Sequence, residues 1–127
     1  MHILIADDHA VVRRGLREIM ADALPGAAFS EAGNGDEVLS HLGKSQIAML
    51  VLDINMPFMT GLEVLSRIRR DAGGHRVKVL LLTASGELKD VQEGLALGAD
   101  DYVAKPFSPA VLVQRIKALL ASPSEPP

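Results

Sequence analysis

The sequence predicts an α/β domain in which a parallel β-sheet is covered by helices on both faces. Five times along the chain, a short aliphatic or β-branched run precedes a stretch whose apolar residues recur at helical spacing. This alternation is typical of parallel sheets with crossover helices. The runs MLVLD and VKVLLLT are almost continuously apolar, as expected for central strands that are buried on both sides.

The strand runs are rich in aliphatic residues and short enough to be single strands. The five predicted strands are His2–Ala6, Ala27–Glu31, Ala48–Leu52, Val77–Leu82 and Asp101–Val103. The five predicted helices are Ala10–Ala23, Asn34–Leu42, Thr60–Arg70, Leu88–Leu97 and Pro109–Leu120. In the first and last helices the apolar residues form one clear stripe. Ser108 can cap the last helix, and Pro109 suits its first turn.

Length and composition indicate one ordinary domain. The chain has 127 residues, of which 48% are hydrophobic, enough for a core without crosslinks. We assign residues 1–121 to this domain. Residues 122–127, SPSEPP, have the composition of a Pro/Ser-rich tail or the start of a linker.

Several classes of protein are disfavoured by composition. There is no cysteine, which excludes disulfides and cysteine-bound metals and agrees with a cytoplasmic location. No apolar run approaches the ~20 residues that cross a bilayer, and the N-terminus does not read as a signal peptide. A net charge of −3 predicts no direct binding of nucleic acid. The cluster Arg13, Arg14 and Arg17 is interpreted as the solvated face of a helix, without a role.

Polar residues follow the predicted strands at the edge where parallel α/β sheets bind ligands. Asp7 and Asp8 follow the first strand, Asp53 the third, Thr83 the fourth, and Lys105 the fifth. Three carboxylates at one edge repel each other, so the cluster needs a cation or a proton. Mg²⁺ fits carboxylate, carbonyl and phosphate oxygens best, whereas no calcium loop is present and zinc lacks ligands. His9 is interpreted as a loop residue.

This set of residues supplies the parts that phosphoryl transfer needs: a nucleophile, a metal and donors for the phosphate oxygens. Asp53 is the candidate nucleophile, while Lys105 and Thr83 offer an ammonium and a hydroxyl. In the alternative interpretation, Asp7 and Asp8 cap the first helix, Asp53 ends a strand, and Lys105 neutralises them. Each residue alone favours that alternative, but five of them at strand ends favour a site.

Four motifs resemble those of the response-regulator receiver family over residues 2 to 121. They are IADD after the first strand, LDINMP after the third, LLTAS after the fourth and YVAKPF after the fifth. The resemblance implies a flavodoxin-like (βα)5 fold with strand order 2-1-3-4-5. It also implies a phosphoacceptor signalling domain rather than a conventional enzyme, one that takes its phosphoryl group from a sensor histidine kinase or a histidine phosphotransfer protein.

By the same resemblance, Asp53 is the phosphoacceptor, and Lys105 and Thr83 bind the acyl phosphate. Mg²⁺ is bound by Asp8 and Asp53, by Asp7 through water, and by the backbone carbonyl of Asn55. Tyr102 resembles the switch aromatic that turns inward as Thr83 moves, which remodels the face made by helix four, strand five and helix five. Lys105–Pro106 resembles the family's cis peptide bond.

The output is less well specified. DDHAVVRRGL resembles receivers that precede a helix-turn-helix domain, whereas GADDYVAKPF resembles those of winged-helix regulators or hybrid kinases. An output domain or an effector protein is therefore expected, with an excised receiver and a stand-alone receiver as alternatives. A homodimer stays open, because Asp100, Asp101 and Arg115 fit the paired charges of one family interface but Val111 replaces an acid there.

Three rival functions remain. A phosphatase or phosphotransferase that uses an aspartyl phosphate would need an acid where Asn55 stands. A docking module that is not phosphorylated would normally have lost an acidic residue or the lysine. A dinucleotide-binding domain would need a glycine-rich turn, which IADDHAVVRRG lacks.

Overall fold

The computed structural model describes residues 1–71, 77–84 and 87–121, and the predicted tail 122–127 lies outside them. The strands are β1 (His2–Ala6), β2 (Ala28–Ala32), β3 (Met49–Asp53), β4 (Lys78–Ala84) and β5 (Asp101–Lys105). The helices are α1 (Ala10–Ala23), α2 (Gly35–Lys44), α3 (Gly61–Arg70), α4 (Leu88–Ala96) and α5 (Pro109–Ala121). Strands and helices alternate as the sequence predicts.

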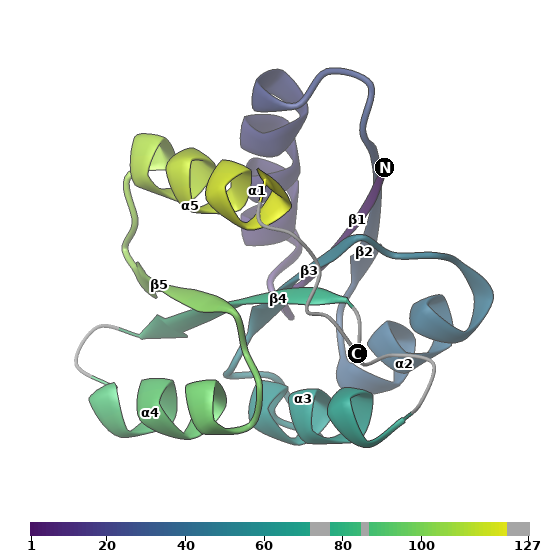
Figure 1. The fold of residues 1–127 in the computed structure, drawn as a ribbon, viewed down its shortest axis with the longest axis vertical. Helices are drawn as coiled ribbons and strands as arrows, with labels where there is room; N and C mark the ends of the chain where they lie inside the picture. The colour runs from purple at the N-terminus through teal and green to yellow at the C-terminus, as the bar shows by residue number, and fades with distance from the viewer. Residues whose placement is uncertain (72–76, 85–86, 122–127) are drawn as a thin grey trace.

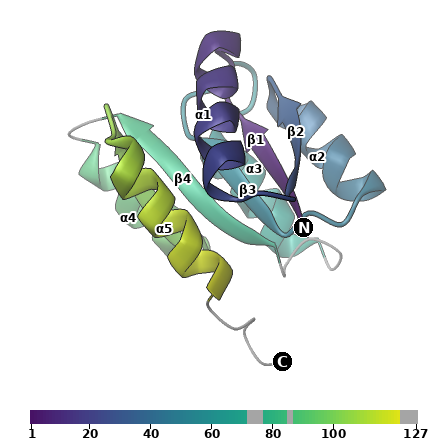
Figure 2. The ribbon, with the colours of Figure 1, turned by 90° about the horizontal axis from the view of Figure 1, so that it is seen from above.

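The five strands form one parallel sheet in the order β2-β1-β3-β4-β5, which confirms the predicted flavodoxin-like topology. Helices α1 and α5 cover one face of the sheet, and α2, α3 and α4 cover the other (Figure 1). A view from above also places α1 and α5 together on one side (Figure 2). The sheet is therefore buried on both faces.

Alternate strand residues enter two hydrophobic clusters, one under each helical layer. Leu50 and Leu52 of β3 cluster with residues of α2 and α3, whereas Met49 and Val51 cluster with residues of α1 and α5. All five residues of β3 are buried, which explains its continuously apolar sequence. Each buried aliphatic side chain contributes roughly 1.5–3 kcal/mol, so the central strands anchor the fold.

Several boundaries differ from the predicted ones by a few residues. Asn34 and Thr60, predicted as helical, are the N-caps of α2 and α3, and their side chains accept hydrogen bonds from Glu37 N and Glu63 N. Strands β3, β4 and β5 run further than predicted because their last residues still pair with their neighbours. Lys105 is consequently the last residue of β5, not a residue beyond it.

No helix in the described part of the chain is both long enough and apolar enough to cross a membrane.

Candidate functional site

The carboxyl ends of the central strands bring the predicted polar residues to one edge of the sheet. Asp7 directly follows β1, Asp53 ends β3, Thr83 lies next to the end of β4, and Lys105 ends β5. Asp7, Asp53 and Thr83 are almost completely buried, at 0%, 2% and 2% exposure, and they are the polar residues buried in the described chain. Burying a polar group costs free energy unless it has a hydrogen-bond or ion-pair partner, so these three side chains are expected to have partners.

Lys105 joins the two buried carboxylates. Its Nζ lies 3.0 Å from Oδ2 of Asp7 and 3.2 Å from Oδ2 of Asp53. The other oxygen of each carboxylate accepts a backbone hydrogen bond, Asp7 from His9 N at 2.9 Å and Asp53 from Asn55 N at 3.2 Å. The structure therefore brings Asp7, Asp53 and Lys105 together as predicted.

The electrostatics of this group are unbalanced, with two buried acids for one base. Burial, followed by the charge of Asp7, raises the pKa of Asp53 above its ordinary value, although Lys105 opposes the shift. Burial alone would lower the pKa of Lys105, but its hydrogen bond to Asp7 and the charges of both carboxylates outweigh burial and raise it. The surroundings therefore favour the charged form of Lys105 and disfavour the charged form of Asp53.

Asp8 lies at the open side of the site, beside Asp7 and His9. One carboxylate oxygen from each acid and Nδ1 of His9 lie within 4.8 Å of one another, close enough to share a metal ion. His9 Nδ1 is 3.1 Å from Oδ1 of Asp8 and 3.4 Å from Oδ1 of Asp7. His9 was predicted only as a loop residue, although its place directly after Asp7 and Asp8 in the sequence is a signal that could have indicated this contact.

Asp7 and Asp8 do not cap α1 through their side chains, contrary to the alternative interpretation. The N-cap is His9, and α1 has no side-chain cap. Neither acid therefore serves as the cap of α1. The remaining predicted residues lie nearby: the hydroxyl of buried Thr83 donates to its neighbour's carbonyl, Ala84 O, at 3.4 Å, and Asn55 is exposed in the loop after β3.

The loop from β3 to α3 carries the backbone that surrounds Asp53. Gly61 N donates to Ile54 O at 2.8 Å, which closes the loop against the end of β3. Phe58 adopts φ +69°, a conformation unusual for a bulky residue, and its side chain is 99% exposed. The Lys105–Pro106 peptide bond is cis, as predicted.

The donor set fits a hard divalent cation. Asp7, Asp8 and Asp53 provide carboxylate oxygens, the ligands that Mg²⁺ prefers, and Lys105 is one positive charge shared by two buried acids. A bound cation would supply the missing positive charge. Residues Asp7, Asp8 and Asp53, with the backbone carbonyl of Asn55, are the candidates to hold it.

Two of the arginines predicted to be solvated have defined contacts instead. Arg13 Nη1 donates to Asp7 O at 2.6 Å, and Arg13 Nε and Arg17 Nη1 donate to the carboxylate of Glu31 at 3.2 and 3.0 Å. Arg14 and Arg17 are exposed, as predicted for a solvated face, but the prediction was wrong for Arg13, whose side chain is only 18% exposed because β2 brings Glu31 beside α1. The pairing of β1 with β2 is a tertiary fact that the local sequence does not show.

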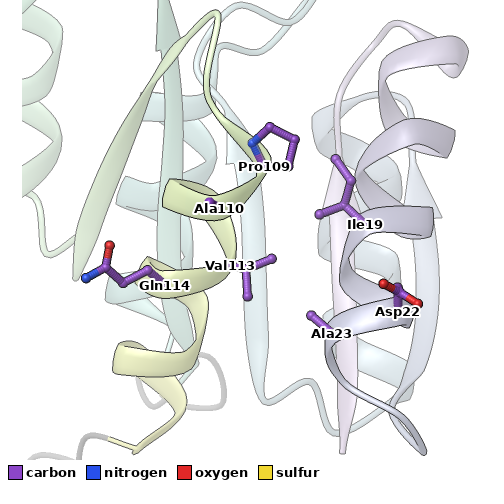
Figure 3. Close-up of a pocket in the computed structure, with 7 residues that line it drawn as sticks. All are labelled: Ile19, Asp22, Ala23, Pro109, Ala110, Val113 and Gln114. Atoms are coloured by element: carbon purple, nitrogen blue, oxygen red, sulfur yellow. The ribbon is translucent and has the colours of Figure 1, made fainter.

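A groove between α1 and α5 lies apart from the acidic site (Figure 3). Its walls are Ile19, Asp22 and Ala23 of α1, and Pro109, Ala110, Val113 and Gln114 of α5. Asp22 is the one ionisable residue among them. The groove therefore offers no cluster of reactive groups, and the chemistry of this chain lies at the sheet edge.

A model of the response regulator receiver domain family matches residues 3–117 of the chain. The chain belongs to this family. Receiver domains are signalling domains of two-component systems that work with histidine kinases and with output domains. The fold and the buried Asp53–Lys105 pair described above agree with that membership.

Among curated proteins, this receiver domain is 38% identical over 123 residues to the transcriptional regulatory protein ResD of Bacillus subtilis. That match covers 97% of the chain and 49% of ResD, so the chain spans about half the length of the curated relatives it matches.

Two solved structures show the same architecture over nearly the whole chain. A Chloroflexus aurantiacus protein assigned as a response regulator matches with a TM-score of 0.89 and 33% identity, covering 95% of this receiver domain and 98% of that chain. The chemotaxis protein CheY4 of Vibrio cholerae matches with a TM-score of 0.84 and 30% identity, covering 93% and 97%. Both matches agree with the family assignment and with the strand order of the sheet.

Proposed function

We propose that this receiver domain accepts a phosphoryl group from a phosphohistidine onto Asp53 in a Mg²⁺-dependent reaction. The donor is a sensor histidine kinase or a histidine phosphotransfer protein. The observation that carries the proposal is the pairing of Asp53 with Lys105, 3.2 Å apart, at the open edge of the sheet. The side chain of Lys105 is 29% exposed, so a lysine shared by two buried acids is available to an incoming phosphate.

In the reaction, a carboxylate oxygen of Asp53 attacks the phosphorus, an O–P bond forms, and the P–N bond to the donor imidazole breaks. The imidazole leaves with the electron pair of that bond and takes up a proton. Lys105 exchanges its contact with Asp53 for one with a phosphate oxygen, while its contact with Asp7 holds it in place. The Thr83 hydroxyl, which has a weak 3.4 Å hydrogen bond, is free to turn toward the phosphate.

The cation would be held by Asp7, Asp8 and Asp53 and by the backbone carbonyl of Asn55. When bound, Mg²⁺ neutralises charge on the phosphate oxygens. The residues of the chain fix Asp53 for attack: Asn55 N binds one carboxylate oxygen, and Lys105 binds the other. His9, next to the acids, lies at the side from which a donor must approach.

We also propose that phosphorylation changes the α4–β5–α5 surface through Thr83 and Tyr102. Tyr102 is half-buried and packs against the cluster under α2, α3 and α4, and β4–β5 pairing places it opposite Leu81. We expect Tyr102→Ala to be phosphorylated normally but to lose the phosphorylation-dependent change in amide exchange of β5 and α4. An undiminished change in that variant would refute the switch role.

The same surface is the proposed output site. Leu88, Leu95 and Val111 on α4 and α5 are exposed, which suits contact with an output domain or an effector protein. Asp101 and Arg115, residues that fit one family dimer interface, pair with each other within the chain at 2.8 Å. We propose that the receiver, residues 1–121, acts in the cytoplasm as part of a longer regulator and does not itself bind nucleic acid. A homodimer through this surface is a secondary mode of association.

The test is the intact mass after incubation with phosphoramidate, with and without Mg²⁺, for the wild type and Asp53→Asn. We expect one phosphoryl group to be added in the presence of Mg²⁺ and none in the variant. No addition under any condition would instead support a docking module that works without phosphorylation.

A further inference from the structure

Arg13 of α1 reaches back to the loop that carries the acidic pair. Its Nη1 donates to the backbone carbonyl of Asp7 at 2.6 Å, and its Nε donates to Glu31 of β2 at 3.2 Å. The side chain is only 18% exposed. One guanidinium thus connects α1, β2 and the backbone between β1 and α1.

The carbonyl that Arg13 binds belongs to the peptide group joining Asp7 to Asp8. Because that group is planar, fixing its oxygen also fixes the direction in which the chain leaves toward Asp8. The other polar groups of Asp7 already have partners: N–H donates to Ala32 O at 3.1 Å, and the carboxylate binds His9 N and Lys105. Arg13 completes the set that holds this residue.

Asp8 has no comparable support of its own. Its side chain is 29% exposed, and among the described residues it contacts His9, whose own side chain is 70% exposed, at 3.1 Å. The place of the Asp8 carboxylate therefore depends on its backbone, and that backbone depends on the peptide held by Arg13.

We propose that Arg13 is a positioning residue for the cation site, acting on Asp8 through the Asp7–Asp8 peptide group. The inference rests on the proposed Mg²⁺ site. A guanidinium can bind Glu31 with one nitrogen and the carbonyl with another, in one plane, whereas a lysine ammonium has no such fork. Groups that orient metal ligands in this way typically contribute about 10-fold or more to affinity.

If Arg13 positions Asp8, its removal weakens metal binding, whereas the loss of its positive charge alone would strengthen metal binding. Arg13 is a cation near a cation site, so removing it relieves repulsion and by itself would tighten metal binding. Arg17 is a matched control, because it binds the same Glu31 carboxylate but makes no recorded contact with Asp7. Removing Arg17 therefore measures how the loss of one positive charge and of one ion pair with Glu31 changes the affinity for the metal ion.

The experiment is titration of the full chain with Mn²⁺, which accepts the same oxygen ligands, followed by electron paramagnetic resonance and by competition with Mg²⁺. We expect Arg13→Lys, which keeps the charge, and Arg13→Ala to bind Mn²⁺ about 10-fold more weakly than the wild type. Arg17→Ala should bind as tightly as the wild type or more tightly. Circular dichroism confirms that each variant is folded, and Arg13→Lys serves if Arg13→Ala is not.

An unchanged affinity in Arg13→Lys, or a tighter affinity in Arg13→Ala, would overturn the proposal. An equal loss in Arg17→Ala would overturn it as well, since Glu31 and not the Asp7 carbonyl would then be responsible. If the wild type binds neither Mn²⁺ nor Mg²⁺, the proposed cation site itself fails, which is a different outcome from a site that binds but ignores Arg13.

Discussion

Asp53 is buried beside a second buried carboxylate, Asp7. Lys105 neutralises part of this charge, yet the pKa of Asp53 stays above its ordinary value because burial and Asp7 together outweigh the lysine. The folded protein therefore holds a proton on Asp53 more tightly than the unfolded chain does. The burial of the Asp53 carboxylate, the proposed nucleophile, therefore lowers the stability of the folded protein.

The stability linked to that proton has a definite sign. It is fully present below the ordinary pKa of an aspartate and is lost as the pH rises through the raised pKa of the folded state. Near neutral pH and without divalent cations, we expect Asp53→Asn to unfold at a temperature a few degrees higher than the wild type. Thermal unfolding over a range of pH measures this, and the difference should shrink as the solution becomes acidic.

A suitable control is Glu18→Gln, which removes one negative charge from the exposed surface of α1. It should change the unfolding temperature little at any pH. A lower unfolding temperature for Asp53→Asn at neutral pH would show that Lys105 compensates for the buried charge more fully than we infer.

At the scale of single elements, the start of α3 determines how the backbone surrounds Asp53. A Cβ atom on Gly61 would collide with the backbone carbonyl oxygen of Asp53 and would lie 2.8 Å from Cα of Ile54. Contacts with backbone cannot be relieved by turning a side chain. The first residue of α3 must therefore be glycine for the helix to lie so close to the phosphoacceptor.

We expect Gly61→Ala to lower the free energy of unfolding by roughly 1–3 kcal/mol, because the helix or the end of β3 must shift. The same shift should slow phosphorylation by phosphoramidate, since it moves Asp53. Denaturant unfolding and intact mass over time measure the two effects.

Gly15→Ala in α1 is the matched control. A Cβ there would meet no atom within 4 Å, so alanine should stabilise the helix by up to about 1 kcal/mol and leave phosphorylation unchanged. Similar behaviour of the two variants would mean that the close approach at Gly61 is not what limits the site.

At the scale of the whole molecule, the carboxyl and amino ends of the strands form two edges of the sheet with different roles. The carboxyl edge carries the site, while the amino edge is held by Arg69 of α3. Its guanidinium donates to Gly98 O at 3.0 and 2.9 Å and to Val77 O at 2.8 Å, and it pairs with Asp100 at 3.1 Å. One side chain thus joins α3 to the starts of β4 and β5.

We expect Arg69→Lys to reduce the free energy of unfolding by roughly 1–3 kcal/mol, because one ammonium cannot replace these hydrogen bonds. The rate of phosphorylation by phosphoramidate should stay close to that of the wild type, since Asp53 lies at the other edge. Arg67→Lys, on an exposed position of the same helix, should change neither quantity. A large loss of phosphorylation in Arg69→Lys would show that the two edges are coupled.

Local sequence determined much of this protein. The apolar runs identified all five strands, α1 was predicted with its observed bounds, and Asp7, Asp53, Thr83 and Lys105 lie at the strand ends where the motifs predicted them. These features depend on neighbours within a few residues. Asn34 and Thr60 were predicted as the first residues of their helices, but they are N-caps with an extended backbone. A cap directly precedes its helix in the sequence, so the sequence pattern does not separate the two.

Only the tertiary structure decided which groups touch across the sheet. It placed Lys105 of β5 between Asp7 and Asp53, and it brought Arg13 of α1 against Glu31 of β2. Each of these contacts joins residues carried by different strands or helices, and their meeting depends on strand order and register. The periodicity of one segment reports which of its faces is buried, but not which residue of another segment that face will meet.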